Sequence, residues 1–168
     1  MLLNRHSTIW ATTTFRISPT IVHRIYALWN TTIPALCQTY AYAELSSELT
    51  FQALPSAPPS DNPNTMGFAP GSAPEKDLLF LQIIFFFQDA SATDGLYNEL
   101  KNFIRLFEKE AEKEGVKHDY LYLNFAAWFQ DPLAAYGKEQ LKQLKHVAKK
   151  YDPEGFYQKQ LDKGFKLF

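Results

Sequence analysis

The stretch Leu78–Phe87, with the sequence LLFLQIIFFF, decides the fold of the chain. Gln82 is its only polar residue. A strand formed here therefore has no polar face and must be covered on both sides. The stretch is too short to span a bilayer, which takes about 20 apolar residues. We predict that residues 78–87 form the central strand of a sheet.

Two strands and a helix are predicted upstream of this central strand. Residues 8–15 are rich in β-branched and aromatic side chains, and residues 42–54 alternate between apolar and polar side chains. Both patterns are typical of strands. Between them, Ser18 and Pro19 form a typical helix N-terminus, and an apolar stripe of helical period follows. We expect this helix to end by Pro34.

Downstream, the pattern predicts a helix that begins near Ser91 and Asp94 and ends at Gly115. A fourth strand is predicted over residues 119–124 and a last helix over residues 138–150. The resulting order, β-α-β-β-α-β, is that of the ferredoxin-like fold, an antiparallel sheet with both helices on one face. We predict an α+β protein of this kind, with a C-terminal helix and tail added.

The chain is predicted to form one unit in two parts, an α+β domain over residues 1–118 and a strand, helix and tail over residues 119–168. Residues 55–76 hold six of the ten prolines and cannot form a regular element. A loop of this length is either a flexible excursion or a lid over a ligand. The C-terminal part is rich in lysine, which indicates either a solvated helix face or a contact with phosphate or an acidic domain.

Composition excludes several classes of protein. The net charge of −1, with 46% hydrophobic and 15% aromatic residues, indicates a globular domain and favours neither nucleic acid nor an acidic membrane as partner. Cys37 is the one cysteine, and the four histidines have no metal-ligand spacing, so no disulfide and no metal site is predicted. Residues 1–6 do not form the apolar core of a signal peptide, and the compartment is left unassigned.

Two amides are candidates for a binding site. Asn124 follows the predicted fourth strand, with Tyr122, Phe125 and Trp128 around it. Its amide could bond the edge of a planar heterocycle that the aromatic side chains cover, or it could cap the following turn beneath core aromatics. Gln82 either bonds a neighbour within the sheet or points into a pocket. As a neutral amide, Gln82 cannot act as a general base.

The C-terminal motif resembles a known family. Its residues, in order, are Tyr122, Asn124, Tyr136, Gly137, and the run Lys150, Tyr151, Asp152 and Pro153. This order resembles the C-terminal signature of the berberine bridge enzyme-like FAD-linked oxidases. The runs at residues 8–12 and 51–55 also resemble the substrate domain of fungal-type members. The resemblance implies that residues 1–118 are a substrate-type domain and residues 119–168 the flavin-facing end of an FAD-linked oxidoreductase.

The resemblance also implies roles for single residues. Tyr122, Asn124 and Phe125 would approach the isoalloxazine ring of FAD, and Gln82 and Trp128 would contact a small organic substrate such as a secondary metabolite. Phe125 replaces the family's tyrosine, and Gln82 offers no catalytic carboxylate, so no catalytic residue is assigned. The glycine-rich half that holds the FAD diphosphate in this family has no counterpart in the 168 residues. We therefore expect weak FAD binding, no activity of the chain alone, and a separate flavin-binding domain as partner.

Two other functions fit the same residues. The chain could be a stand-alone ferredoxin-like module that dimerises through its sheet and binds a small hydrophobic molecule. It could also be a non-catalytic partner that docks onto a separate flavin domain through an exposed apolar sheet face.

Overall fold

The structure, a computed structural model, describes residues 7–54, 78–161 and 163–168. The proline-rich loop predicted over residues 55–76 lies outside the described residues, so neither interpretation of it is tested. The strands are β1 (Ser7–Arg16), β2 (Ser46–Leu54), β3 (Leu78–Phe87) and β4 (Lys117–His118). The α-helices are α1 (Pro19–Thr39), α2 (Thr93–Glu114), α3 (Lys138–Tyr151) and α4 (Phe156–Lys159). Short 3-10 turns are η1 (Ala41–Ala43), η2 (Ala90–Ala92), η3 (Leu123–Phe125) and η4 (Ala134–Tyr136).

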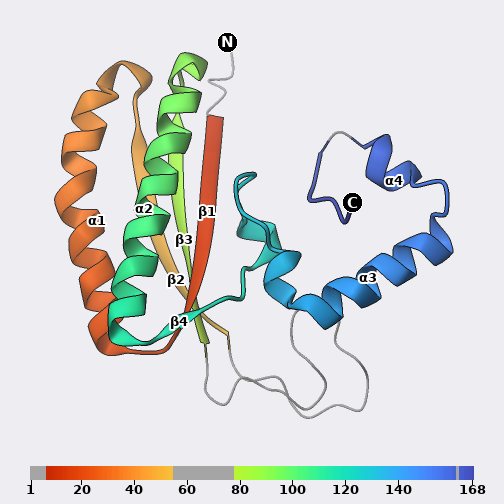
Figure 1. Ribbon diagram of the computed structural model, residues 1–168. Helices are drawn as coiled ribbons and strands as arrows, with labels where there is room; N and C mark the ends of the chain where they lie inside the picture. Colours follow the sequence, from red (N-terminus) through yellow and green to blue (C-terminus); the bar gives the residue numbers. More distant parts are fainter. Residues whose placement is uncertain (1–6, 55–77, 162) are drawn as a thin grey trace.

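The four strands form one antiparallel sheet in the order β2-β3-β1-β4. The central strand β3 pairs along its whole length with β1, from Ser7 opposite Phe87 to Arg16 opposite Leu78. Helices α1 and α2 both lie on one face of this sheet (Figure 1). The predicted ferredoxin-like α+β fold is therefore confirmed.

The main core lies between the sheet and these two helices. Alternate residues of the strands point toward the helices because successive side chains of a strand point to opposite faces. The buried strand residues of this core are Ile9, Ala11, Phe15, Leu81, Ile83, Phe85 and Phe87. They pack against helix residues that include Ile21, Ile25, Leu96, Leu100 and Phe107. The apolar stripes seen in the sequence are thus the faces that meet in the core.

The other face of the sheet is only partly covered. Leu78 and Phe80 are buried at one end of β3, whereas Ile84 and Phe86 at the other end are half-buried. Trp10 of β1, which lies opposite Ile84 in the register, is 39% exposed. The prediction that both faces of β3 are covered holds for the first end and is wrong for the second. An apolar surface of the sheet is left open there, and we refer to this side of the sheet as the open face.

Helix α1 is longer than predicted, because it runs through Pro34 to Thr39. A proline inside a helix removes one backbone hydrogen bond. Here the apolar stripe continues on both sides of it, and Ile33 and Leu36 are buried against the core. Burial of these two side chains offsets the lost bond. The following strand consequently begins at Ser46 rather than at residue 42.

Helix α2 begins between the two residues predicted to open it and ends where predicted, but the predicted cap is not formed. The helix begins at Thr93, and the side chain of Asp89 accepts a bond from the backbone N–H of Ser91 in the preceding turn. Ser91 therefore does not cap the helix. Gly115 ends α2 with a φ of 70°, as expected for a residue that must adopt the left-handed conformation.

The predicted fourth strand over residues 119–124 is wrong, since β4 covers only Lys117–His118. Two side chains explain the early end. Nδ1 of His118 accepts the backbone N–H of Tyr120 at 3.1 Å, so this N–H is not free to pair with β1. Farther along β1, the amide of Gln130 takes the place of a strand. Its Oε1 accepts from Thr12 N at 3.2 Å, and its Nε2 donates to Thr12 O at 2.6 Å.

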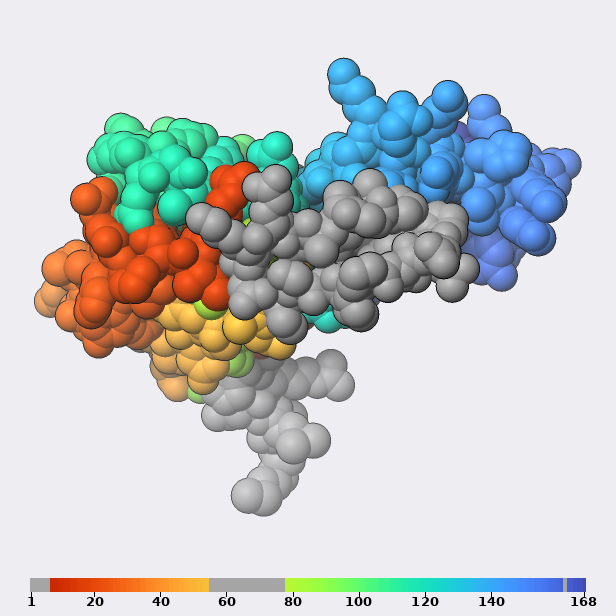
Figure 2. All heavy atoms as spheres, turned by 90° about the horizontal axis from the view of Figure 1, so that it is seen from below, coloured from red at the N-terminus to blue at the C-terminus, as the bar shows by residue number. Residues whose placement is uncertain are grey.

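A second apolar cluster holds the C-terminal part. Tyr120, Leu133 and Tyr136 are its buried members, and half-buried residues packed against them include Leu141 and Leu144 of α3 and Phe165 and Leu167 of the tail. Val147 of α3 lies outside this cluster and is 47% exposed. Figures 1 and 2 show α3 and α4 extending from the sheet on the side away from α1.

His118 should make stability depend on pH. Burial lowers its pKa below the ordinary value near 6.5, the charge of Arg16 lowers the pKa further, and the Asp119 carboxylate opposes both effects. The folded chain therefore binds this proton less readily than the unfolded chain. The stabilisation is complete above about pH 6.5 and is lost as the pH falls toward the folded pKa. We expect the free energy of unfolding in urea to fall between pH 7.5 and pH 5.5.

A variant isolates this contribution. His118→Asn keeps an acceptor for the N–H of Tyr120 at the position of Nδ1 but cannot bind a proton. The variant should lose less stability than the natural chain between the two pH values. Equal losses in the two proteins would show that His118 does not carry the effect.

Candidate functional site

Four side chains meet where residues 119–125 reach the open face of the sheet. The ring of Tyr122 stacks on Phe80 of β3 with centroids 5.1 Å apart, and Phe125 lies 5.8 Å from the same ring. Tyr122 and Phe125 contact each other edge to face at 4.9 Å. The amide Nδ2 of Asn124 donates to the Tyr122 hydroxyl at 3.1 Å. We call Phe80, Tyr122, Asn124 and Phe125 the Phe80 cluster.

The side chain of Asn124 is exposed, and its hydrogen bond goes to a tyrosine hydroxyl rather than to a turn backbone. The 3-10 turn η3 has no side-chain cap. The interpretation of Asn124 as a turn cap beneath buried aromatics is therefore not what the structure shows. Besides this bond, the exposed amide and the Tyr122 hydroxyl can each make a further hydrogen bond to the edge of a polar ring.

Gln82 lies on the same face of the sheet as this cluster. It follows Phe80 by two positions on β3, so their side chains share a face. Its register partners are Thr12 of β1 and Thr50 of β2. Thr12 is buried and donates its hydroxyl to the carbonyl of Leu81 at 2.7 Å. The half-buried Gln82 therefore sits in a row of polar side chains across the middle of the sheet.

Trp128 lies elsewhere, although we expected it to contact a substrate together with Gln82. Its ring meets Tyr97 of α2 edge to face at 5.6 Å and Phe129 at 6.1 Å, and the residue is 70% exposed. Tyr97 packs against the core on the helix side of the sheet. The structure thus joins Tyr122, Asn124 and Phe125 in one cluster, places Gln82 on the same sheet face, and puts Trp128 beside α2.

Two further tyrosines adjoin the cluster, Tyr120 and the motif residue Tyr136, and the sequence assigned neither of them to the candidate site. Tyr120 and Tyr136 are buried and stack with centroids 6.2 Å apart. Burial raises the pKa of Tyr120 to about 12, with smaller contributions from Tyr136 and Tyr122. Burial and the nearby Tyr122 also raise the pKa of Tyr136. Both phenols stay protonated near neutral pH, so they can donate hydrogen bonds but cannot act as bases.

The described residues fit the flavin ring of FAD but not its diphosphate. Asn124 and Tyr122 offer a donor and an acceptor at the edge of an aromatic surface, which suits the polar edge of a flavin ring. A dinucleotide also needs a place for its diphosphate, which proteins commonly hold with a glycine-rich turn at a helix N-terminus. No such turn adjoins the Phe80 cluster in the part of the chain that the structure describes.

Within residues 7–54, 78–161 and 163–168, no group of three or more His, Cys, Asp or Glu side chains could hold a metal ion. In the same ranges, the helices are too short or too polar to cross a membrane.

The site is thus an aromatic surface with an exposed amide, set on the open face of a ferredoxin-like sheet. The chain is 41% identical over 80 residues to FAD-dependent monooxygenase sdcF of Emericella nidulans and 38% identical over 80 residues to FAD-dependent monooxygenase drtC of Aspergillus calidoustus. It is also 42% identical over 57 residues to FAD-dependent monooxygenase tpcD of Cochliobolus heterostrophus. These matches relate part of the chain to flavin-dependent oxidoreductases.

The matches are partial on both sides. They cover 47%, 48% and 34% of this chain and only 17%, 15% and 11% of the three relatives, in the same order. The matched part of the chain therefore spans less than a fifth of the length of each relative. No protein-family model matches the chain, and no solved structure matches it.

Proposed function

We propose that the chain is the ring-covering and substrate-binding part of an FAD-linked oxidoreductase of the berberine bridge enzyme-like type. The observation that carries this proposal is the exposed Asn124 amide, bonded to Tyr122 at the end of an apolar sheet face that the chain's own helices leave open. The similarity to part of three FAD-dependent monooxygenases supports the same cofactor.

The roles of the residues follow from their positions. Tyr122 and Asn124 would meet the polar edge of the isoalloxazine ring, and Phe125 would cover part of it. Gln82 lies on the same face and would form a hydrogen bond, as donor or acceptor, with a small organic substrate such as a secondary metabolite. When bound, FAD would take a hydride from that substrate. This chain's part is to position the substrate and to exclude water from the ring.

The chain alone should be a poor flavoprotein. The described residues near the Phe80 cluster would contact only the ring end of FAD, so the diphosphate would gain little from them. A separate flavin-binding polypeptide would therefore be the partner that makes the site complete. We expect purified chain to be colourless and to take up added FAD weakly.

The test is a chimera with a relative that holds the remainder of the protein. The matched region of sdcF would be replaced with this whole chain, which is 41% identical to sdcF over 80 residues. The chimera should be purified yellow, with near-stoichiometric FAD. Asn124→Ala in the chimera should weaken FAD binding up to about tenfold, because one hydrogen bond to the ring edge is lost.

Asn30→Ala is the matched control, since Asn30 is exposed on α1 on the opposite side of the sheet. It should leave FAD binding unchanged. A folded chimera without FAD would overturn the proposal. A stable homodimer of the chain alone, with no affinity for the flavin-binding part of sdcF, would favour the stand-alone module instead.

A further inference from the structure

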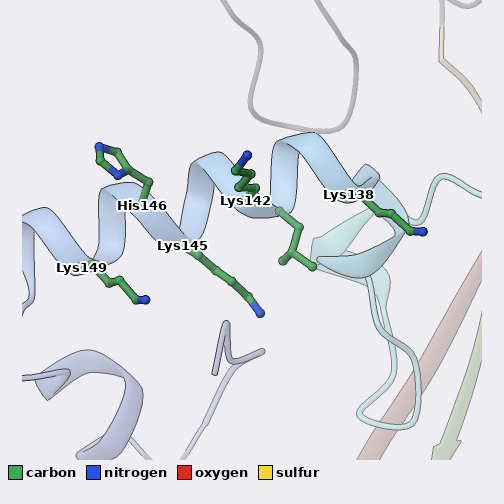
Figure 3. A pocket seen from close by; sticks show the side chains of 6 residues that line it. Lys138, Lys142, Lys145, His146 and Lys149 are labelled. Atoms are coloured by element: carbon green, nitrogen blue, oxygen red, sulfur yellow. The ribbon is translucent and has the colours of Figure 1, made fainter.

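A basic groove runs along α3, away from the Phe80 cluster. It encloses about 500 Å³ and is lined by Lys138, Leu141, Lys142, Lys145, His146 and Lys149. These residues form two neighbouring rows of i, i+4 spacing on the helix. Figure 3 shows Lys142 and His146 extending to one side of the helix and Lys145 and Lys149 to the other.

The charge of this groove is not neutralised by the described residues. Helix α3 carries five lysines and one acidic residue, Glu139, which gives 5 − 1 = +4. In the described part of the chain, no lysine of α3 forms a salt bridge. The cations near α2 differ, because Arg24, Lys113 and Lys117 each pair with a glutamate. The α3 lysines therefore repel one another, and a bound anion would relieve this repulsion.

An aromatic ring lies beside the groove, and an apolar side chain lines it. The Nζ atoms of Lys145 and Lys149 lie 5.6 Å and 5.8 Å from the centre of the Phe168 ring. Phe168 is 61% exposed, so the ring is accessible. Leu141 lines the same groove. A ligand that contacts Lys145 and Lys149 and extends beyond the groove would reach an aromatic ring as well.

We propose that this groove binds a small molecule that carries two adjacent phosphates. The lysine rows extend over about 11 residues of helix, or roughly 16 Å, which is more than a single carboxylate could contact. Lysine ammonium groups are compact point charges that suit phosphate oxygens. The volume lies in the range of about 300–1,000 Å³ that is usual for small-molecule sites. The inference does not depend on the proposed function, although FAD itself contains a diphosphate.

The test is a calorimetric titration of the full 168-residue chain with inorganic pyrophosphate at constant ionic strength. We expect saturable binding at one site per chain. The double variant Lys142→Ala, Lys145→Ala should weaken this binding at least about tenfold, because two exposed charge contacts are removed. The double variant Lys109→Ala, Lys163→Ala changes the net charge equally, lies outside the groove, and should bind as the natural chain does. Circular dichroism would show that both variants are folded.

Titrations with other ligands show which kind of diphosphate the groove binds. ADP should bind more tightly than pyrophosphate if its base stacks on Phe168, and Phe168→Ala should remove that difference. FAD should compete with pyrophosphate, whereas riboflavin, which has no phosphate, should not. Equal weakening by both double variants would overturn the proposal, because it would show attraction by net charge alone. The absence of saturable binding, or tighter binding of a glutamate-rich peptide than of pyrophosphate, would overturn it as well.

Discussion

Phe85→Ala should lower the free energy of unfolding by about 3 to 5 kcal/mol. Phe85 is fully buried in the middle of the main core, where its ring meets Phe103 of α2 edge to face at 6.1 Å. Alanine would leave a cavity between the sheet and α2 that the surrounding strands cannot fill, since both neighbours of β3 hold it in place. Because small domains are stable by about 5 to 15 kcal/mol, a loss of this size should leave a protein that unfolds in dilute urea.

The adjacent Phe86 gives a matched control. It is the same residue type on the same strand, but its side chain points to the open face and is only half-buried. Phe86→Ala should cost much less, about 1 kcal/mol, because little area leaves a packed environment. Urea unfolding of the two variants measures the difference. Equal losses would contradict the description of the sheet as covered by helices on one face and partly open on the other.

Phe80→Ala should have the second large effect, again about 3 to 5 kcal/mol. Phe80 is 3% exposed and is the residue on which Tyr122 and Phe125 both pack. Unlike Phe85, Phe80 lies outside the main core. Its loss should therefore free residues 119–125 from the sheet before the helices separate from it. The cluster around Asn124 would lose its defined geometry.

Amide hydrogen exchange is the measurement that separates these two sites. In Phe80→Ala, the exchange rates of residues 120–127 should rise more than those of α1 and α2. In Phe85→Ala, the rates should rise throughout the sheet and both helices. Phe80→Leu should restore part of the protection, because it refills most of the volume. A uniform rise in Phe80→Ala would show that the Phe80 cluster is not a separate structural element.

The sequence patterns were sufficient for the fold class, because the alternation in β2 and the apolar β3 leave few other arrangements. They were insufficient where a side chain, rather than a neighbouring strand, makes the hydrogen bonds to the edge of the sheet. Gln130 bonds Thr12, which lies 118 residues away, and no local pattern reveals that this amide occupies the edge of β1. Pro34 was expected to end α1 because local propensity was counted without the burial of Ile33 and Leu36.

The candidate site, too, could be predicted only in part from the sequence. Tyr122, Asn124 and Phe125 are neighbours in the sequence, so their grouping could be predicted. That Phe80 belongs to the same cluster could not be predicted, because this depends on where residues 119–125 cross the sheet. Trp128 is only four residues from Asn124, yet it lies beside α2. The position of a side chain after an irregular segment is set by tertiary contacts, which spacing alone does not give.

In the proposed function, the Phe80 cluster lies against the flavin ring of an oxidoreductase. Flavin fluorescence in the sdcF chimera tests this most directly, because a tyrosine in contact with a flavin quenches its emission by electron transfer. At equal FAD content, we expect weak emission from the chimera and a clear rise in emission when Tyr122 is replaced by leucine. An emission that Tyr122→Leu leaves unchanged in a folded, FAD-loaded chimera would contradict the claim.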